Sequence, residues 1–135
     1  MNNDLNIVLQ KAGLRTTKPR IEIFSTLRSF NKPMGVTDII AACPDIDKVS
    51  VYRTIDLFVR LRMVSNIPHG WKHLYELAAP FSPHHHHLIC EKCGNLTEIR
   101  SEKLELMIAN LTDEHNFRAT AHHFEITGVC RECSL

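Results

Sequence analysis

The amino-acid sequence predicts an α+β fold in two parts, with short helices in the first part and strands with one helix in the second. Apolar residues recur at helical spacing in the first part, and short apolar runs between turn residues follow. Residues 1–67 hold ten Lys and Arg against six Asp and Glu, and residues 68–135 hold six against nine, so the halves carry +4 and −3. A basic part joined to an acidic one suggests a nucleic-acid module attached to a second module, although a solvated surface has the same composition.

Two helices are predicted before residue 33. The first carries the apolar residues from Leu5 to Ala12 and stops at Gly13. The second opens at Thr17-Lys18-Pro19, where the threonine supplies a capping hydroxyl and the proline occupies the first turn. Pro33 and Gly35 then break this helix.

Two further helices complete the first part. A short one is capped by Thr37 and ends at Cys43-Pro44, and a longer one runs from about Lys48 to Arg62. The longer helix leaves aromatic and basic side chains, among them Tyr52 and Arg53, outside its apolar stripe. This order fits a helix-turn-helix whose last helix enters the DNA major groove. An ordinary helical bundle with solvated Arg residues is the alternative.

A β-hairpin is predicted directly after these helices. It consists of a strand over 63–67, a turn at Pro68-His69-Gly70 and a strand over 71–77, which together make the first part a winged helix. The wing tip carries His69, Lys72 and His73, which can approach phosphates. We therefore assign residues 1–77 to a winged-helix DNA-binding domain, 78–83 to a hinge and 84–135 to a second domain.

The second part is predicted to be a small α/β module. A strand containing Leu88-Ile89 and a strand over 96–99 precede a helix from Ser101 to about Asn116, and a last strand runs from Ala121 to Thr127. Exposed strand edges in such a module commonly pair into dimers. The fold class is thus an N-terminal winged helix-turn-helix plus a C-terminal α/β dimerisation domain with a four-cysteine zinc site.

The zinc site is predicted from two cysteine pairs, Cys90 with Cys93 and Cys130 with Cys133. A two-residue gap lets both thiolates of a pair face one tetrahedral zinc ion, and Gly94 favours the tight knuckle. Redox dithiols and unliganded cysteines are the alternatives, but the βαβ pattern around a redox motif is absent. Cys43 is interpreted as a small buried core residue.

Four consecutive histidines, His84 to His87, precede the first cysteine pair. In an extended chain, successive side chains point to opposite faces, so one run can supply two metal sites. Imidazole with carboxylate suits zinc, ferrous iron or manganese. Partners available along the chain are Glu76, Glu98, Glu105, His122 and His123.

These motifs together resemble those of the ferric uptake regulator family, over nearly the whole chain. The family comprises dimeric, metal-dependent DNA-binding regulators, usually repressors, with an N-terminal winged helix and a C-terminal metal-binding dimerisation domain. The resemblance is carried, in order, by Arg15-Thr16-Thr17-Lys18-Pro19-Arg20, Val51-Tyr52-Arg53, Tyr75-Glu76-Leu77, His84 to Gly94, and Gly128 to Cys133.

The resemblance implies a role for each group of residues. It implies that the four paired cysteines hold structural zinc and that a second ion, Zn²⁺ or Fe²⁺ with Mn²⁺ possible, regulates binding to a palindromic A/T-rich operator by a homodimer. The implied regulatory ligands are Glu76, His85, His87 and Glu98. A further metal site is implied at His84, His86, Glu105 and His122. The implied DNA-binding residues are Arg15 in the minor groove, Arg20 at the backbone, Tyr52 and Arg53 at the bases, and Ser50.

The chain also departs from the family pattern. Met34 stands about where the family often has a histidine ligand, and His69 or His73 is a candidate replacement. Peroxide sensors of the family commonly have Asp where this chain has Glu98. A peroxide-sensing or Mn²⁺-sensing member and a metal-buffering zinc protein remain alternatives. A zinc hydrolase is disfavoured because no His-Glu-x-x-His motif is present.

The sequence also predicts where the protein resides. It has no run of eighteen apolar residues and therefore no predicted membrane span. Its N-terminus lacks the basic start and apolar run of a secretory signal. A cytoplasmic location follows, where reducing conditions favour cysteine pairs that bind metal over disulfides.

Overall fold

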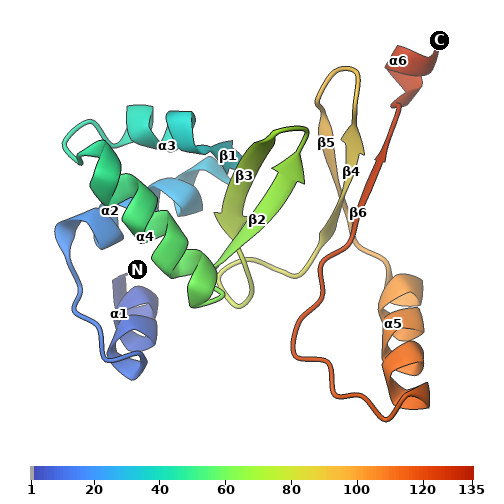
Figure 1. Cartoon of the computed structure of the whole chain (residues 1–135), viewed down its shortest axis with the longest axis horizontal. Helices are drawn as coiled ribbons and strands as arrows, with labels where there is room; N and C mark the ends of the chain where they lie inside the picture. The colour runs from blue at the N-terminus through green and yellow to red at the C-terminus, as the bar shows by residue number, and fades with distance from the viewer. Residues whose placement is uncertain (1) are drawn as a thin grey trace. The chain divides into compact units, whose positions relative to one another are not determined.

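A computed structural model of the chain describes residues 2–135 and divides into two compact units, one ending at Pro83 and one running from His84 to Leu135. Figure 1 shows helices and a hairpin in the first unit and a sheet with helices in the second. The predicted α+β fold is confirmed. The first unit contains α1 (Asn2–Lys11), α2 (Lys18–Phe30), β1 (Met34–Gly35), α3 (Val36–Ala42), α4 (Lys48–Arg60), β2 (Val64–His69) and β3 (Lys72–Leu77). The second contains β4 (His86–Cys90), β5 (Leu96–Ile99), α5 (Glu102–Glu114), β6 (Glu125–Gly128) and α6 (Arg131–Ser134).

The core of the first unit lies between its helices and a small antiparallel sheet of order β1-β3-β2. Phe24 of α2 and Phe58 of α4 meet edge to face, with ring centroids 6.5 Å apart. Phe81, in the segment predicted as a hinge, packs edge to face on Phe24 at 5.1 Å. The amide of Ala78 also donates to the carbonyl of Met63 at 2.9 Å. The first residues after β3 are therefore fastened to the first unit.

Two predicted helix caps are wrong in detail. Thr17 stands at the N-cap of α2, but its hydroxyl makes no capping hydrogen bond. Thr37 lies inside α3, whose N-cap is Gly35. The start of α4 is capped by Asp47, which accepts hydrogen bonds from the Ser50 hydroxyl and amide at 2.7 and 3.1 Å. These bonds lower the pKa of the Asp47 carboxyl below its ordinary 3.8.

The β2–β3 hairpin, residues 64–77, is called the wing from here on. It follows α4 directly, as predicted, but its turn lies at Gly70-Trp71 and not at Pro68-His69-Gly70, because β2 continues to His69. Strand β1, whose Met34 pairs with Tyr75 of β3, was not predicted from the sequence.

The second unit is a mixed sheet of order β5-β4-β6 with helix α5. Strand β4 pairs antiparallel with β5 and parallel with β6. The last strand starts only at Glu125, so His122 and His123, which were predicted within it, lie outside it. Helix α6 was not predicted. Within residues 2–135, no helix is both long and apolar enough to cross a membrane.

Candidate metal centres and nucleic-acid interface

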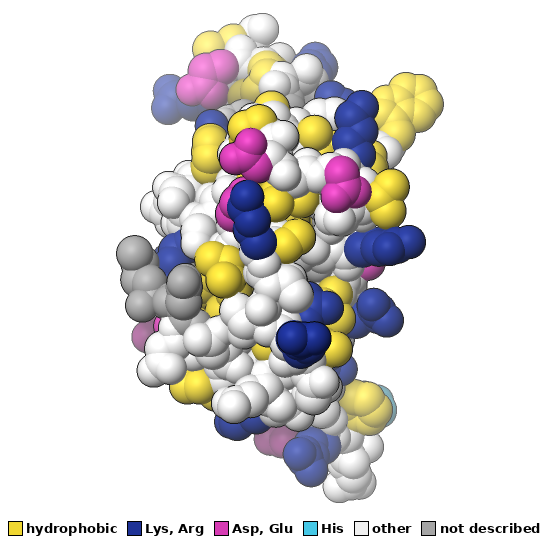
Figure 2. Space-filling view, turned by 90° about the vertical axis from the view of Figure 1, so that its left-hand side faces the viewer, with side chains coloured by type: hydrophobic (Ala, Val, Ile, Leu, Met, Phe, Trp, Pro, Cys, Tyr) yellow, Lys and Arg dark blue, Asp and Glu magenta, His cyan; other side chains and the backbone are white. Residues whose placement is uncertain are grey.

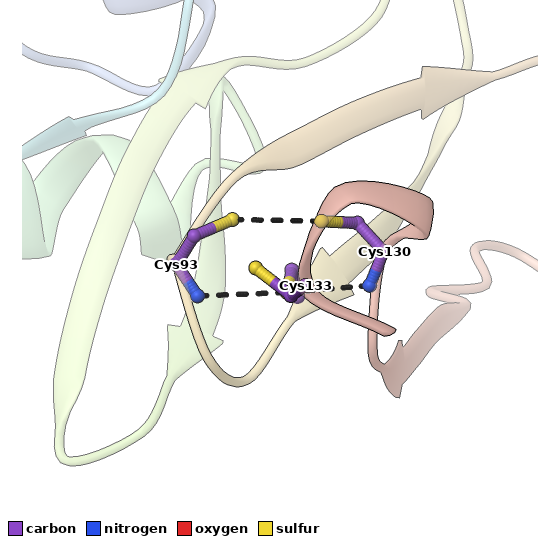
Figure 3. A group of neighbouring side chains, drawn as sticks. Cys93, Cys130 and Cys133 are labelled. Atoms are coloured by element: carbon purple, nitrogen blue, oxygen red, sulfur yellow. Dashed lines mark hydrogen bonds between the residues drawn. The ribbon is translucent and has the colours of Figure 1, made fainter. Parts of the chain in front are cut away.

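The four paired cysteines converge at one end of the second unit. Cys90 ends β4, Cys93 follows in a turn, and Cys130 and Cys133 belong to the start and body of α6. Gly94 closes the turn with φ of +74°, a conformation that glycine adopts without strain. Figure 3 shows the side chains of Cys93, Cys130 and Cys133 directed toward one another.

The spacing of these sulfur atoms suits zinc. All four lie within 4.8 Å of one another. Tetrahedral zinc with Zn–S bonds of about 2.3 Å places its sulfur ligands about 3.8 Å apart, and the Sγ atoms of Cys93 and Cys130 are 3.8 Å apart. The four-cysteine cluster therefore fits a structural zinc ion with little rearrangement.

The thiols of this cluster are also prepared for metal binding. Backbone amides of Cys93 and Cys130 donate to the sulfur of Cys90 at 3.5 and 3.3 Å and lower its pKa to about 6. Hydrogen bonding with the sulfurs of Cys130 and Cys93 raises the pKa of Cys133 to about 12. One thiolate, that of Cys90, thus forms readily near neutral pH, while the raised pKa of Cys133 keeps its thiol protonated. Zinc binding displaces such protons from its ligands.

A second cluster lies on one face of the histidine run. The rings of His84 and His86 have centroids 4.6 Å apart, and the Nε2 atoms of both approach Oε1 of Glu105, at 3.1 and 2.7 Å. His122 completes the group, with its Nε2 2.9 Å from Oε2 of Glu105 and 2.9 Å from Nε2 of His84. The structure therefore brings together all four residues predicted for the further site.

This cluster is already arranged by hydrogen bonds and charge. Burial raises the pKa of the Glu105 carboxyl, but the hydrogen bond from His86 and the charges of His122 and His84 outweigh burial and leave the pKa below its ordinary 4.5. Tetrahedral zinc with bonds of about 2.1 Å needs ligand atoms about 3.4 Å apart. The present distances are shorter, so metal entry requires outward movements of about half an ångström.

The other face of the run carries His85 and His87. Their ring centroids are 4.8 Å apart, and His87 is buried. Glu98 of β5 stands opposite His87 in the strand register, and its Oε1 lies 3.9 Å from Nδ1 of His85. The same Oε1 accepts a hydrogen bond from Arg100 at 2.6 Å, a partner that the sequence analysis missed. Glu76, the fourth residue predicted for this site, is half-buried on β3 of the first unit, opposite Ser65.

Met34 stands where the family often has a loop histidine, and His69 and His73 are the candidate replacements for that histidine. Met34 is only 3% exposed and belongs to the core of the first unit, so its thioether is not available to a metal. His73 is exposed on the wing, and its Nδ1 lies 2.9 Å from the side-chain oxygen of Asn66. His69 is half-buried at the end of β2.

The predicted DNA-binding residues all lie in the first unit. Tyr52 is 51% exposed on α4, and Arg53 beside it is also exposed. Arg20 donates a hydrogen bond to the carbonyl of Arg15 and so orders the segment between α1 and α2. Ser50 is engaged with Asp47 at the start of α4. Figure 2 shows Lys and Arg side chains spread along the right-hand side of its view, among hydrophobic ones.

Residues 11–127 match the sequence profile of the ferric uptake regulator family. The ferric uptake regulation protein of Campylobacter jejuni is 34% identical over 134 residues, which cover 94% of this chain and 84% of that protein. The chain belongs to the ferric uptake regulator family. As members of this family are metal-responsive transcriptional regulators and not enzymes, the predicted class of function is confirmed.

Solved structures of ferric uptake regulators share this fold. The regulator of Pseudomonas aeruginosa, solved with manganese, has a TM-score of 0.83 and 25% identity and covers 93% of this chain and 97% of its own. The crystal structure of the Vibrio cholerae regulator, which reveals a structural rearrangement of its DNA-binding domains, has a TM-score of 0.73 and 27% identity and covers 93% and 98%.

Proposed function

We propose that this ferric uptake regulator family member is a repressor that binds Zn²⁺ or Fe²⁺ at His85, His87, Glu98 and Glu76. The proposal is supported chiefly by the two faces of the histidine run. On one face, His84 and His86 are engaged with Glu105 and His122. His85 and His87 lie paired on the other face, beside Glu98.

The proposed mechanism is a population shift. Glu76 belongs to the first unit, whereas the other three proposed ligands belong to the second. An ion held by ligands from both units would favour one orientation of the DNA-binding domain among many and so raise operator affinity. The rearrangement of DNA-binding domains in the Vibrio cholerae regulator is consistent with such a mechanism.

The remaining roles follow the same proposal. In the cytoplasm, a homodimer would bind a palindromic A/T-rich operator, with Tyr52 and Arg53 at the bases and Arg15 and Arg20 at the minor groove and backbone. Ser50 would join them once its hydroxyl turns from Asp47. The four-cysteine cluster would hold zinc permanently, and the His84 cluster would bind a further ion.

The ligand set allows more than one regulatory metal. Two imidazoles and two carboxylates complete a tetrahedral zinc site, and bidentate carboxylates extend the same set toward the higher coordination numbers of Fe²⁺. Mn²⁺ sensing is the alternative within the family, since the Pseudomonas aeruginosa regulator was solved with manganese.

The test compares operator binding by zinc-replete protein with and without added Zn²⁺, Fe²⁺ or Mn²⁺, at fixed salt. We expect the regulatory metal to raise affinity by roughly 10–100-fold, the usual range of coupling between two sites. Fixed salt matters because phosphate contacts make affinity steeply salt-dependent. Equal affinity with and without every metal would contradict the proposal.

Arg100 is predicted to weaken metal binding at this site because it competes for Glu98. The pair is short but more than half exposed on the Arg100 side, so its contribution is small. Arg100→Gln should raise regulatory-metal affinity about threefold, within the range for an exposed ion pair. Competition titration with a chelating dye measures this change, with Arg118→Gln as a control. A lower affinity in Arg100→Gln would show that the arginine assists binding instead.

A further inference from the structure

Trp71 is the only tryptophan of the chain and is 99% exposed at the tip of the wing. A tryptophan presents a large apolar surface, and its exposure to water is unfavourable unless a partner covers it. The wing contains buried apolar side chains, Ile67 and Leu77, so exposure of Trp71 is not a general property of this hairpin.

The turn holds this indole in a defined place. His69 and Lys72 are paired across the hairpin, which leaves Gly70 and Trp71 as a two-residue connection. Gly70 has φ of +63°, the conformation that tight hairpin turns require and that glycine adopts without strain. The ring therefore projects from the end of a regular ladder and not from a long loop.

The surroundings of Trp71 are suited to a polyanion. The segment from 57 to 75 contains no Asp or Glu. Lys72 follows the tryptophan directly and is exposed. Arg60 and Arg62 are also exposed, but they precede β2 and so lie toward the end of the hairpin opposite its turn. Strand β2 also contacts α4, the proposed recognition helix, within the same unit. An exposed aromatic ring next to a lysine, in a segment without acidic residues and on a hairpin that packs against the proposed recognition helix, is suited to contact nucleic acid.

We propose that Trp71 packs on double-stranded DNA in the minor groove next to the major groove that α4 enters, while Lys72 neutralises an adjacent phosphate. This inference rests on the proposed function, because it assumes that α4 reads DNA. Apolar side chains placed in a minor groove pack on sugars and partly unstack base steps. Trp71 thereby adds affinity that depends on groove width and step flexibility at positions that α4 does not touch.

The single tryptophan gives a direct test. The fluorescence of metal-loaded protein is quenched with iodide, with and without operator duplex. We expect DNA to reduce the quenching constant of Trp71 severalfold. Protection that appears on metal loading without DNA, or only at high protein concentration, would place the indole in a protein contact and overturn the proposal.

Two neighbouring substitutions separate an apolar contact from a charge contact. Trp71→Ala should weaken operator binding about tenfold, within the range for one aromatic–base contact, and leave the salt dependence unchanged. Lys72→Gln should lower the slope of log affinity against log salt by about 0.9, because one phosphate contact is lost. Trp71→Phe should fall between wild type and Trp71→Ala.

The outcomes distinguish this inference from the proposed function. If wild-type protein fails to bind the operator with any metal, the proposed function fails. If wild-type protein binds and Trp71→Ala binds equally well, with its zinc content and melting temperature unchanged, only the role of Trp71 is overturned. Tyr52→Ala, which removes the proposed base contact on α4, is the positive control for lost binding.

Discussion

Replacing Cys93 by Ser is expected to abolish tight zinc binding and to unfold the second unit while the first unit stays folded. The second unit has little else to stabilise it. Among residues 84–135, Ile89 and Cys90 are the only apolar residues that are buried. No residue of helix α5 is buried. Domains of this size commonly need a metal or a partner because their cores are small. Structural zinc supplies on the order of 10 kcal/mol of apparent folding free energy in small zinc domains.

Cys93 is the informative cysteine because its side chain is exposed. Substitution there leaves packing intact, so any loss of structure arises through the metal. Elemental analysis measures the expected loss of zinc. Thermal unfolding measures the loss of the second unit's unfolding transition, and sedimentation measures the loss of the proposed dimer. Cys43→Ala is the control, since Cys43 is buried in the first unit, and it should keep its zinc. Full zinc content and an unchanged unfolding profile in Cys93→Ser would refute a structural role for this site.

Exposed apolar residues on the second unit also indicate that this unit needs a metal or a partner for its stability. Leu106, Met107 and Leu111 of α5 are each more than half exposed. The sequence predicted α5 from its apolar spacing, but spacing cannot show whether the apolar face finds a partner within its own chain. The first unit behaves differently, because Val51, Ile55 and Phe58 of α4 are buried in one core.

The errors of the sequence analysis have local causes. Pro68 was interpreted as a turn residue, yet it lies within β2. Strand β2 is an edge of its sheet, and an edge strand tolerates a residue without an N–H. Strand β1 and helix α6 are too short to show periodicity, at two and four residues. The burial of Met34 depends on the pairing of β1 with β3, which no local pattern encodes.

The sequence predicted those features of the candidate sites that follow from strand geometry, namely which histidines share a face. Side chains alternate between the two faces of an extended chain, so the histidines can be divided into two faces without knowledge of the fold. The structure pairs the rings in this way, His84 with His86 and His85 with His87. The hydrogen bond between Arg100 and Glu98 was not predictable in the same way. Residues two apart on an extended chain share a face, but the sequence does not determine whether a long arginine side chain turns to that neighbour or to solvent. Arg100 directly follows β5.

Replacing His87 by Gln is expected to remove the metal-dependent gain in operator affinity, whereas His86→Gln retains it. The two residues form a matched pair, because they are adjacent on β4 and are 4% and 2% exposed. Their substitution should therefore disturb packing about equally. Only the faces differ: His86 approaches Glu105, and His87 stands opposite Glu98. A difference in regulation between the variants can then be assigned to the metal site on each face.

The measurement is operator affinity with and without the regulatory metal for wild type and both variants, together with zinc content and melting temperature. We expect the roughly 10–100-fold metal effect of the wild type to fall to about onefold in His87→Gln. In His86→Gln most of the effect should remain, although the further site loses a ligand. If His86→Gln loses the response and His87→Gln keeps it, the regulatory ion binds on the Glu105 face. If the metal sites on the two faces are coupled so that each requires the other, both variants lose the metal-dependent gain in operator affinity. Either outcome would contradict the assignment of His85, His87 and Glu98 as regulatory ligands, because that assignment requires the two faces of one strand to act separately.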